Sequence, residues 1–69
     1  MLTVQTIGDT AGHVWQFLRQ NGTSNLTAVK RSTKAPEPMV LMAIGWLARE
    51  GKIGLHREGR SLHLWLTEV

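Results

Sequence analysis

The segment MAIGWLAREGKI, residues 42–53, contains the change of pattern that decides the fold. Before Gly51, apolar residues recur every three or four positions, which predicts a helix from about residue 38 to residue 50. After Gly51, apolar residues alternate with polar or small ones in 53–56 and again in 62–66. This alternation is typical of β-strands, so the sequence predicts a helix that leads through a glycine into a hairpin near residues 52–67.

The register of the hairpin follows from its turn. A two-residue loop at residues 58–59 places Leu55 opposite Leu62 and Ile53 opposite Leu64. Both pairs then put apolar side chains on one face, so this register is consistent with a half-buried sheet. The other face carries three residues that we expect on the outside of the hairpin: His56, His63 and Trp65.

Two more helices are expected upstream. Apolar residues on one face predict a first helix from about residue 7 or 8 to residue 21, after an N-terminal segment of residues 1–6. Asp9 or Thr10 is available to cap its start, and Gly22 to end it. A second helix is predicted over residues 27–34, with Thr27 as its N-cap. Prolines at positions 36 and 38 then force a turn before the third helix.

The length permits one domain, residues 1–69, of the α+β class, with three helices followed by a two-stranded hairpin. A chain of 69 residues hides only about 60% of its unfolded surface, so its core has little excess stability. Cysteine is absent, which excludes disulfides and thiolate metal sites. Its stability must come from apolar packing, within one chain or with a second subunit.

Three segments carry a resemblance to a known family: AGHVWQFLRQNG (11–22), LTAVKRST (26–33) and MAIGWLAREGKI (42–53). Together with the element order, they resemble small stand-alone winged helix-turn-helix proteins of bacteria and archaea that form a domain of unknown function. The resemblance covers about residues 8–66. It implies a winged helix-turn-helix fold whose hairpin is the wing, and a DNA-binding function of the regulatory type.

The resemblance also implies where double-stranded DNA would bind. In DNA-binding winged helices the third helix enters the major groove, while the second helix and the wing contact phosphates. The net charge of +3 is weak support, but residues 30–60 hold seven basic and three acidic residues. The implied phosphate contacts are Thr27, Lys30, Arg31, Lys34, Arg57 and Arg60, with His56 as a further wing residue. We expect this binding to be dominated by the backbone and only weakly specific.

The third helix supports an alternative function. Its predicted exposed face consists of Met39, Leu41, Met42, Gly45, Trp46 and Arg49. Only Arg49 can hydrogen-bond to base edges as a sequence reader does, whereas Met39, Leu41, Met42 and Trp46 form an apolar patch typical of a protein interface. A homodimer, another protein, or the N-terminal segment with Leu2, Val4 and Ile7 would cover this patch.

Other functions find little support in the sequence. The serines lack a His/Asp arrangement, and no glycine-rich phosphate loop follows a strand, so we expect no catalytic residues and no enzyme. Two wing histidines are too few for a zinc site, so we expect no metal and no other cofactor. No segment is a signal peptide or is long enough to span a membrane, and no small-molecule substrate is evident. We expect a cytoplasmic protein.

Overall fold

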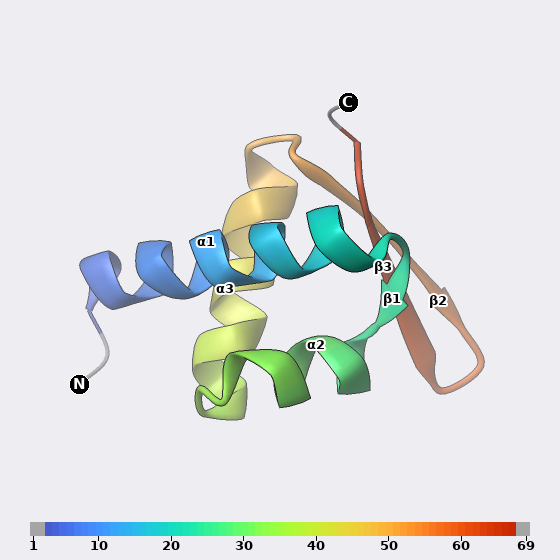
Figure 1. Cartoon of the computed structure of the whole chain (residues 1–69), viewed down its shortest axis with the longest axis horizontal. Coiled ribbons are helices and arrows are strands. Elements are labelled where there is room, and N and C mark those ends of the chain that lie inside the picture. The colour runs from blue at the N-terminus through green and yellow to red at the C-terminus, as the bar shows by residue number, and fades with distance from the viewer. Residues whose placement is uncertain (1–2, 68–69) are drawn as a thin grey trace.

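The structure is a computed structural model that describes residues 3–67. Its elements follow one another as helix, short strand, two helices and hairpin (Figure 1). Their bounds are α1 Val4–Asn21, β1 Ser24–Asn25, α2 Leu26–Thr33, α3 Glu37–Arg49, β2 Ile53–Glu58 and β3 Ser61–Leu66.

Helix α1 begins earlier than predicted. Thr3 is its N-cap, and its hydroxyl accepts a hydrogen bond from the backbone N–H of Thr6 at 3.1 Å. The Thr6 hydroxyl in turn accepts one from the backbone N–H of Thr3 at 2.8 Å, which completes a capping box. The predictions of a cap at Asp9 or Thr10 and of a separate segment over residues 1–6 were therefore wrong for residues 4–6. At the other end Gly22, with φ +75°, terminates the helix as expected.

The cap of α2 also differs from the prediction. Asn25, not Thr27, is the N-cap, and its side-chain oxygen accepts a hydrogen bond from the Ala28 N–H at 2.8 Å. Lys34 ends the helix in the left-handed region, with φ 57°. Pro36 precedes α3 as its N-cap, and Pro38 lies in the first turn of α3, where its missing N–H leaves no bond unmade.

The sheet has three strands in the order β1-β3-β2, all antiparallel. The hairpin was predicted, but β1 was not. Leu55 pairs with Leu64 and Ile53 with Leu66, so the predicted register was wrong by two residues. The same side chains still share a face, because side chains alternate with a period of two. The loop is Gly59-Arg60, and Gly59, with φ +63°, takes the first loop position as a type II′ turn requires.

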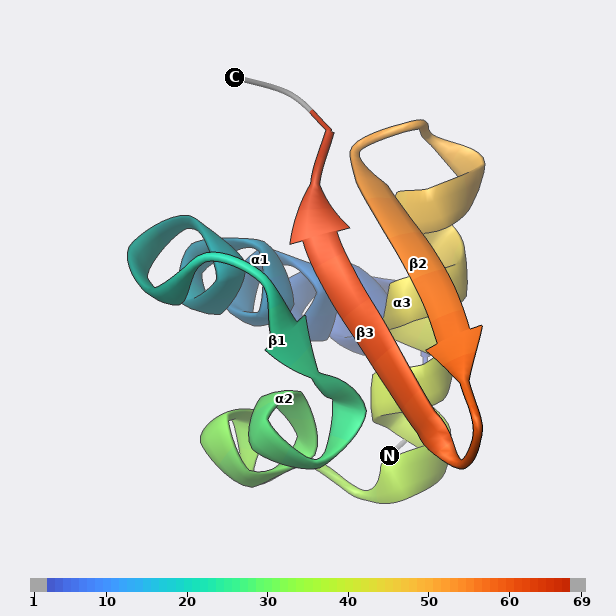
Figure 2. The same cartoon turned by 90° about the vertical axis from the view of Figure 1, so that its right-hand side faces the viewer.

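One core joins the helices to the sheet. Seen from the sheet side in Figure 2, the strands lie in front of α1 and α3, so one face of the sheet packs on these helices. The most fully buried large side chains come from every helix and from the central strand: Val14, Leu18, Val29, Val40 and Leu64. Because the three helices and the wing are arranged as expected, the predicted winged helix-turn-helix fold is confirmed.

Candidate nucleic-acid interface

Helix α2 carries most of the residues predicted to bind phosphate: Thr27, Lys30, Arg31 and the C-cap residue Lys34. The side chains of Thr27, Arg31 and Lys34 are exposed, and that of Lys30 is half-buried. These residues lie within eight consecutive positions, so the helix and its cap bring three positive charges together on one side of the fold.

The tip of the wing supplies the second basic group. Arg57, at the end of β2, and Arg60, in the loop, are both exposed. The Nε of Arg57 donates a hydrogen bond to the Gly59 carbonyl oxygen at 3.1 Å, which restrains its side chain against the turn. His56 is exposed one residue further from the loop.

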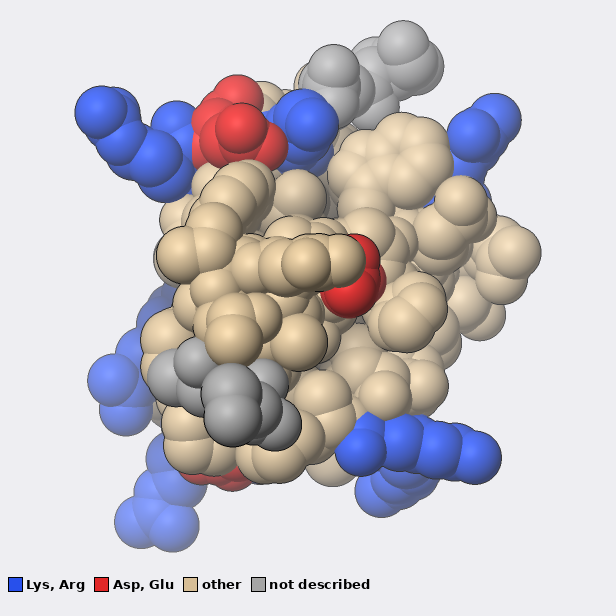
Figure 3. Space-filling view, turned by 90° about the vertical axis from the view of Figure 1, so that its left-hand side faces the viewer, with Lys and Arg blue, Asp and Glu red and all other residues tan. Residues whose placement is uncertain are grey.

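The two basic groups flank the start of α3. Helix α2, the first turn of α3 and the tip of the wing all lie along the lower edge of the molecule (Figures 1 and 2). Figure 3 views the molecule from the side, and there Lys and Arg side chains project at both lower corners as well as at the upper ones, and the two lower groups are separate from each other. The predicted phosphate residues therefore form two groups on either side of α3, and not one continuous cluster.

An acidic residue lies between these groups. Glu37, the first residue of α3, forms an ion pair with Lys30 over 2.5 Å from Nζ to Oε2. The pair neutralises one of the predicted phosphate contacts. Sequence spacing does not predict this pair, because seven positions and a turn separate the two residues.

The apolar face of α3 is smaller than predicted. Leu41, Met42 and Trp46 are exposed, by 44%, 39% and 38% of their surface. Met39 is only 8% exposed, so its assignment to this surface was wrong. Met39 lies one helical turn before Ala43, which is fully buried, and this spacing places it on the core side of α3.

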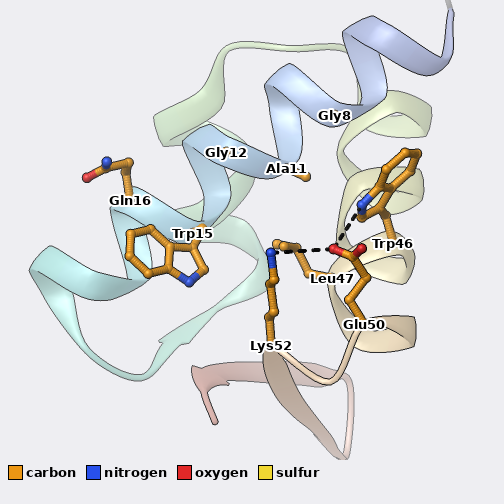
Figure 4. A pocket seen from close by; sticks show the side chains of 9 residues that line it. All are labelled: Gly8, Ala11, Gly12, Trp15, Gln16, Trp46, Leu47, Glu50 and Lys52. Carbon is orange, nitrogen blue, oxygen red and sulfur yellow. Dashed lines mark hydrogen bonds and ion pairs between the residues drawn. The ribbon is translucent and has the colours of Figure 1, made fainter. Parts of the chain in front are cut away.

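A groove of about 380 Å³ runs between α1 and α3 (Figure 4). Trp15 of α1 and Trp46 of α3 lie on opposite sides of it, and Gly8 and Gly12 line the α1 side without side chains of their own. The Nε1–H of Trp46 donates a hydrogen bond to Oε1 of Glu50 at 3.1 Å. The same oxygen of Glu50 lies 3.6 Å from the Nζ of Lys52. The remaining lining residues are Ala11, Gln16 and Leu47.

The described part of the N-terminal segment does not cover the apolar face. Val4 lies in the first turn of α1 and is 69% exposed, and Met42 and Trp46 are exposed by 39% and 38%. Of the other two residues expected to contribute, Ile7 is half-buried and Leu2 lies outside the described residues. Which of the three expected covers applies, the N-terminal segment, a second copy or another protein, therefore stays a prediction.

The outer face of the wing brings the two histidines together. His56 lies directly opposite His63 across the hairpin, where the predicted register made them diagonal neighbours. Within residues 3–67, no three His, Asp or Glu side chains gather in a way that could hold a metal ion. None of the helices in that range has the length and hydropathy to cross a bilayer.

Comparison with known proteins places these features in context. A family model described as "Winged helix-turn-helix domain (DUF2582)" matches residues 1–66. The chain is 32% identical over 65 residues to uncharacterized protein MJ1608 of Methanocaldococcus jannaschii, across 91% of this chain and 89% of that one. It is also similar to the solution NMR structure of protein BT2368 from Bacteroides thetaiotaomicron, with a TM-score of 0.78 and 26% identity. That match covers 90% of this chain and 76% of the other.

Proposed function

Because the chain belongs to the DUF2582 family of winged helix-turn-helix domains, we propose that it is a regulatory-type protein that binds double-stranded DNA. The observation that carries the proposal is the placement of exposed basic residues on both sides of α3, at the positions that contact phosphates in DNA-binding winged helices. The proposed contacts are Thr27, Lys30, Arg31, Lys34, Arg57 and Arg60. In this proposal the protein is a binding module of the cytoplasm and not an enzyme.

The proposed binding is dominated by the phosphate backbone. Each phosphate that Lys or Arg neutralises releases counterions. The logarithm of the affinity therefore falls linearly with the logarithm of the salt concentration, and each such contact adds about 0.9 to the slope. Arg31, Lys34, Arg57 and Arg60 have no acidic partner among the ion pairs of the described residues, whereas Lys30 is paired with Glu37. Four such contacts predict a loss of affinity of about 10²-fold between 50 and 200 mM salt.

The proposed sequence specificity is weak because α3 offers few groups that read bases. Direct readout relies mainly on Arg, Lys, Asn or Gln side chains in the major groove. Within α3, Glu37 is engaged by Lys30, the Trp46 N–H is engaged by Glu50, and Arg49 lies in the last turn. The first half of the helix therefore presents mainly apolar side chains to a DNA groove.

A salt titration with a fluorescent duplex of mixed sequence tests the proposal. We expect binding at about 50 mM salt, and a slope of log affinity against log salt concentration of about four. For the double variant Arg57→Gln/Arg60→Gln this slope is expected to be lower by about two. Arg19→Gln is the matched control, since Arg19 lies on α1 with its guanidinium 5.4 Å from the centre of the Trp15 ring. No binding at about 50 mM salt contradicts the proposal.

The exposed apolar side chains of α3 favour a second candidate function, a protein-interaction winged helix that does not read DNA. Leu41, Met42 and Trp46 would then dock a second copy of this chain or another protein, as in interfaces anchored by Trp and Met. Sedimentation tests the dimer: wild type is expected to self-associate, and Trp46→Ala to weaken the association at least tenfold. A monomeric wild type across the micromolar range contradicts the dimer.

A further inference from the structure

The surface of α3 between the two basic groups is apolar but open. Leu41 and Met42 lie little more than one turn from the start of the helix and expose 44% and 39% of their surface. Gly45, one turn after Leu41, is also exposed, and a Cβ built on it would meet no atom within 4 Å. Two exposed apolar side chains therefore lie beside a position where the helix backbone is unobstructed.

The position of this surface indicates what occupies it. The basic residues of α2 and of the wing tip lie along the same lower edge of the molecule as the start of α3 (Figures 1 and 2), and this excess of positive charge favours a polyanion. In the proposed docking mode the first half of α3 faces the major groove. Leu41 and Met42 would then meet the edges of the base pairs.

The base-pair edges in the major groove offer one apolar group, the 5-methyl group of thymine. Leu and Met side chains cannot hydrogen-bond to the N7, O6 or N4 groups of a G·C pair, and burying those groups against them carries a desolvation cost. They gain free energy by burying a methyl group. The same chemistry applies to the methyl group of 5-methylcytosine, which occupies the corresponding position on its ring.

We propose that Leu41 and Met42 make α3 a reader of 5-methylpyrimidines in the major groove. The inference rests on the proposed DNA binding and adds a base preference to it: thymine-rich or cytosine-methylated duplexes bind more tightly than duplexes without these methyl groups. Gly45 contributes by letting the helix backbone approach the bases, because no side chain stands between them.

The test compares duplexes that differ only in methyl groups. One pair has thymine or deoxyuridine at every T position, and a second pair has 5-methylcytosine or cytosine. Fluorescence anisotropy at about 50 mM salt is expected to show binding weaker by about fourfold for each buried methyl group removed. The first pair tests thymine as the source of the methyl group, and the second tests methylated cytosine.

Protein variants separate the methyl preference from binding in general. Leu41→Ala/Met42→Ala is expected to reduce the thymine-to-deoxyuridine affinity ratio to about one, and both positions are exposed, so the fold should be retained. Arg57→Gln should weaken binding to both duplexes equally and keep the ratio. Leu55→Ala, a change at an exposed leucine of β2, should also keep it.

The outcomes distinguish this inference from the function on which it rests. Equal, salt-dependent affinity for all four duplexes overturns the methyl preference and leaves the proposed DNA binding in place. A preference that persists in Leu41→Ala/Met42→Ala overturns the assignment to these residues. Binding to no duplex overturns the proposed function, and the methyl preference with it.

Discussion

The Nζ of Lys30 lies 2.5 Å from Oε2 of Glu37, so an ion pair joins α2 to the first residue of α3 across the turn of the helix-turn-helix. Both side chains are partly exposed, by 34% and 57%, so the pair contributes at most about 1 kcal/mol to stability. Its larger effect is on charge. It cancels a positive charge in the middle of the proposed DNA surface.

Glu37→Gln is therefore expected to strengthen DNA binding. The change frees Lys30 for a phosphate and removes a negative charge that repels the backbone, so the slope of log affinity against log salt should steepen by about 0.9. Anisotropy titrations from 50 to 200 mM salt measure it. Glu50→Gln is the control, because Glu50 follows the far end of α3 and pairs with Lys52. An unchanged slope in Glu37→Gln shows that Lys30 contacts no phosphate.

Gly54→Ala is expected to destabilise the wing. A Cβ at position 54 would lie 2.5 Å from Cε2 of Trp65, its cross-strand neighbour, whose ring covers the glycine. Relieving this overlap requires a shift of the indole, and overpacking of this kind costs about 1–3 kcal/mol. Chemical denaturation measures the loss. In a Trp65→Ala background the same change should be close to neutral, and a double-mutant cycle gives the coupling.

A glycine in open space provides the contrast to Gly54. Gly12 lies inside α1 and is exposed, and a Cβ built there would meet nothing within 4 Å. Gly12→Ala is expected to stabilise the protein by about 0.5–1 kcal/mol, because alanine loses less backbone entropy in a helix. If Gly12→Ala destabilises a monomeric sample, the open space beside Gly12 in the groove is contradicted.

Asn25→Ala is expected to destabilise the helix-turn-helix by about 1 kcal/mol. It removes the side-chain oxygen that accepts the Ala28 N–H and leaves that donor without its cap. Thr27→Ala is the matched control, because Thr27 lies inside the helix, where alanine is at least as favourable. Thermal unfolding of both variants measures the difference. A larger loss in Thr27→Ala than in Asn25→Ala contradicts the observed start of α2.

Leu64→Ala and Leu55→Ala change two leucines that face each other across the hairpin. Leu64 is fully buried, so its truncation is expected to cost about 2–5 kcal/mol, a large share of the stability of a small domain. Leu55 is 45% exposed, and its truncation should cost less than half as much. Urea denaturation separates the two. Equal losses would falsify the placement of β2 at the edge of the core.

The helix count and the wing were predictable because apolar spacing changes sharply at Gly51. The register was not, because a shift of two residues preserves the apolar face of the hairpin, and alternation alone cannot distinguish the two registers. The choice depends on which residue opens the turn: Gly59 with positive φ selects the loop Gly59-Arg60.

Features that depend on tertiary contacts could not be predicted from the sequence. Strand β1 has only two residues, and it exists because Ser24 and Asn25 pair with β3, some forty positions later. The basic residues of the candidate interface were identifiable by type and position. The pairing of Lys30 with Glu37 was not, because it depends on how the proline-containing turn brings α2 to α3.

The pairing of β1 with β3 also affects the order in which the protein can fold during synthesis. Ser24 lies opposite Leu64, so the segment that leads into α2 has its strand partner only after residues 61–66 have been made. The central strand also supplies Leu64, which lies in one core cluster with residues of all three helices. A nascent chain that ends before β3 therefore lacks both, and contacts this far apart in sequence form slowly. The turn, the wing and the core therefore become ordered together only once β3 has been made.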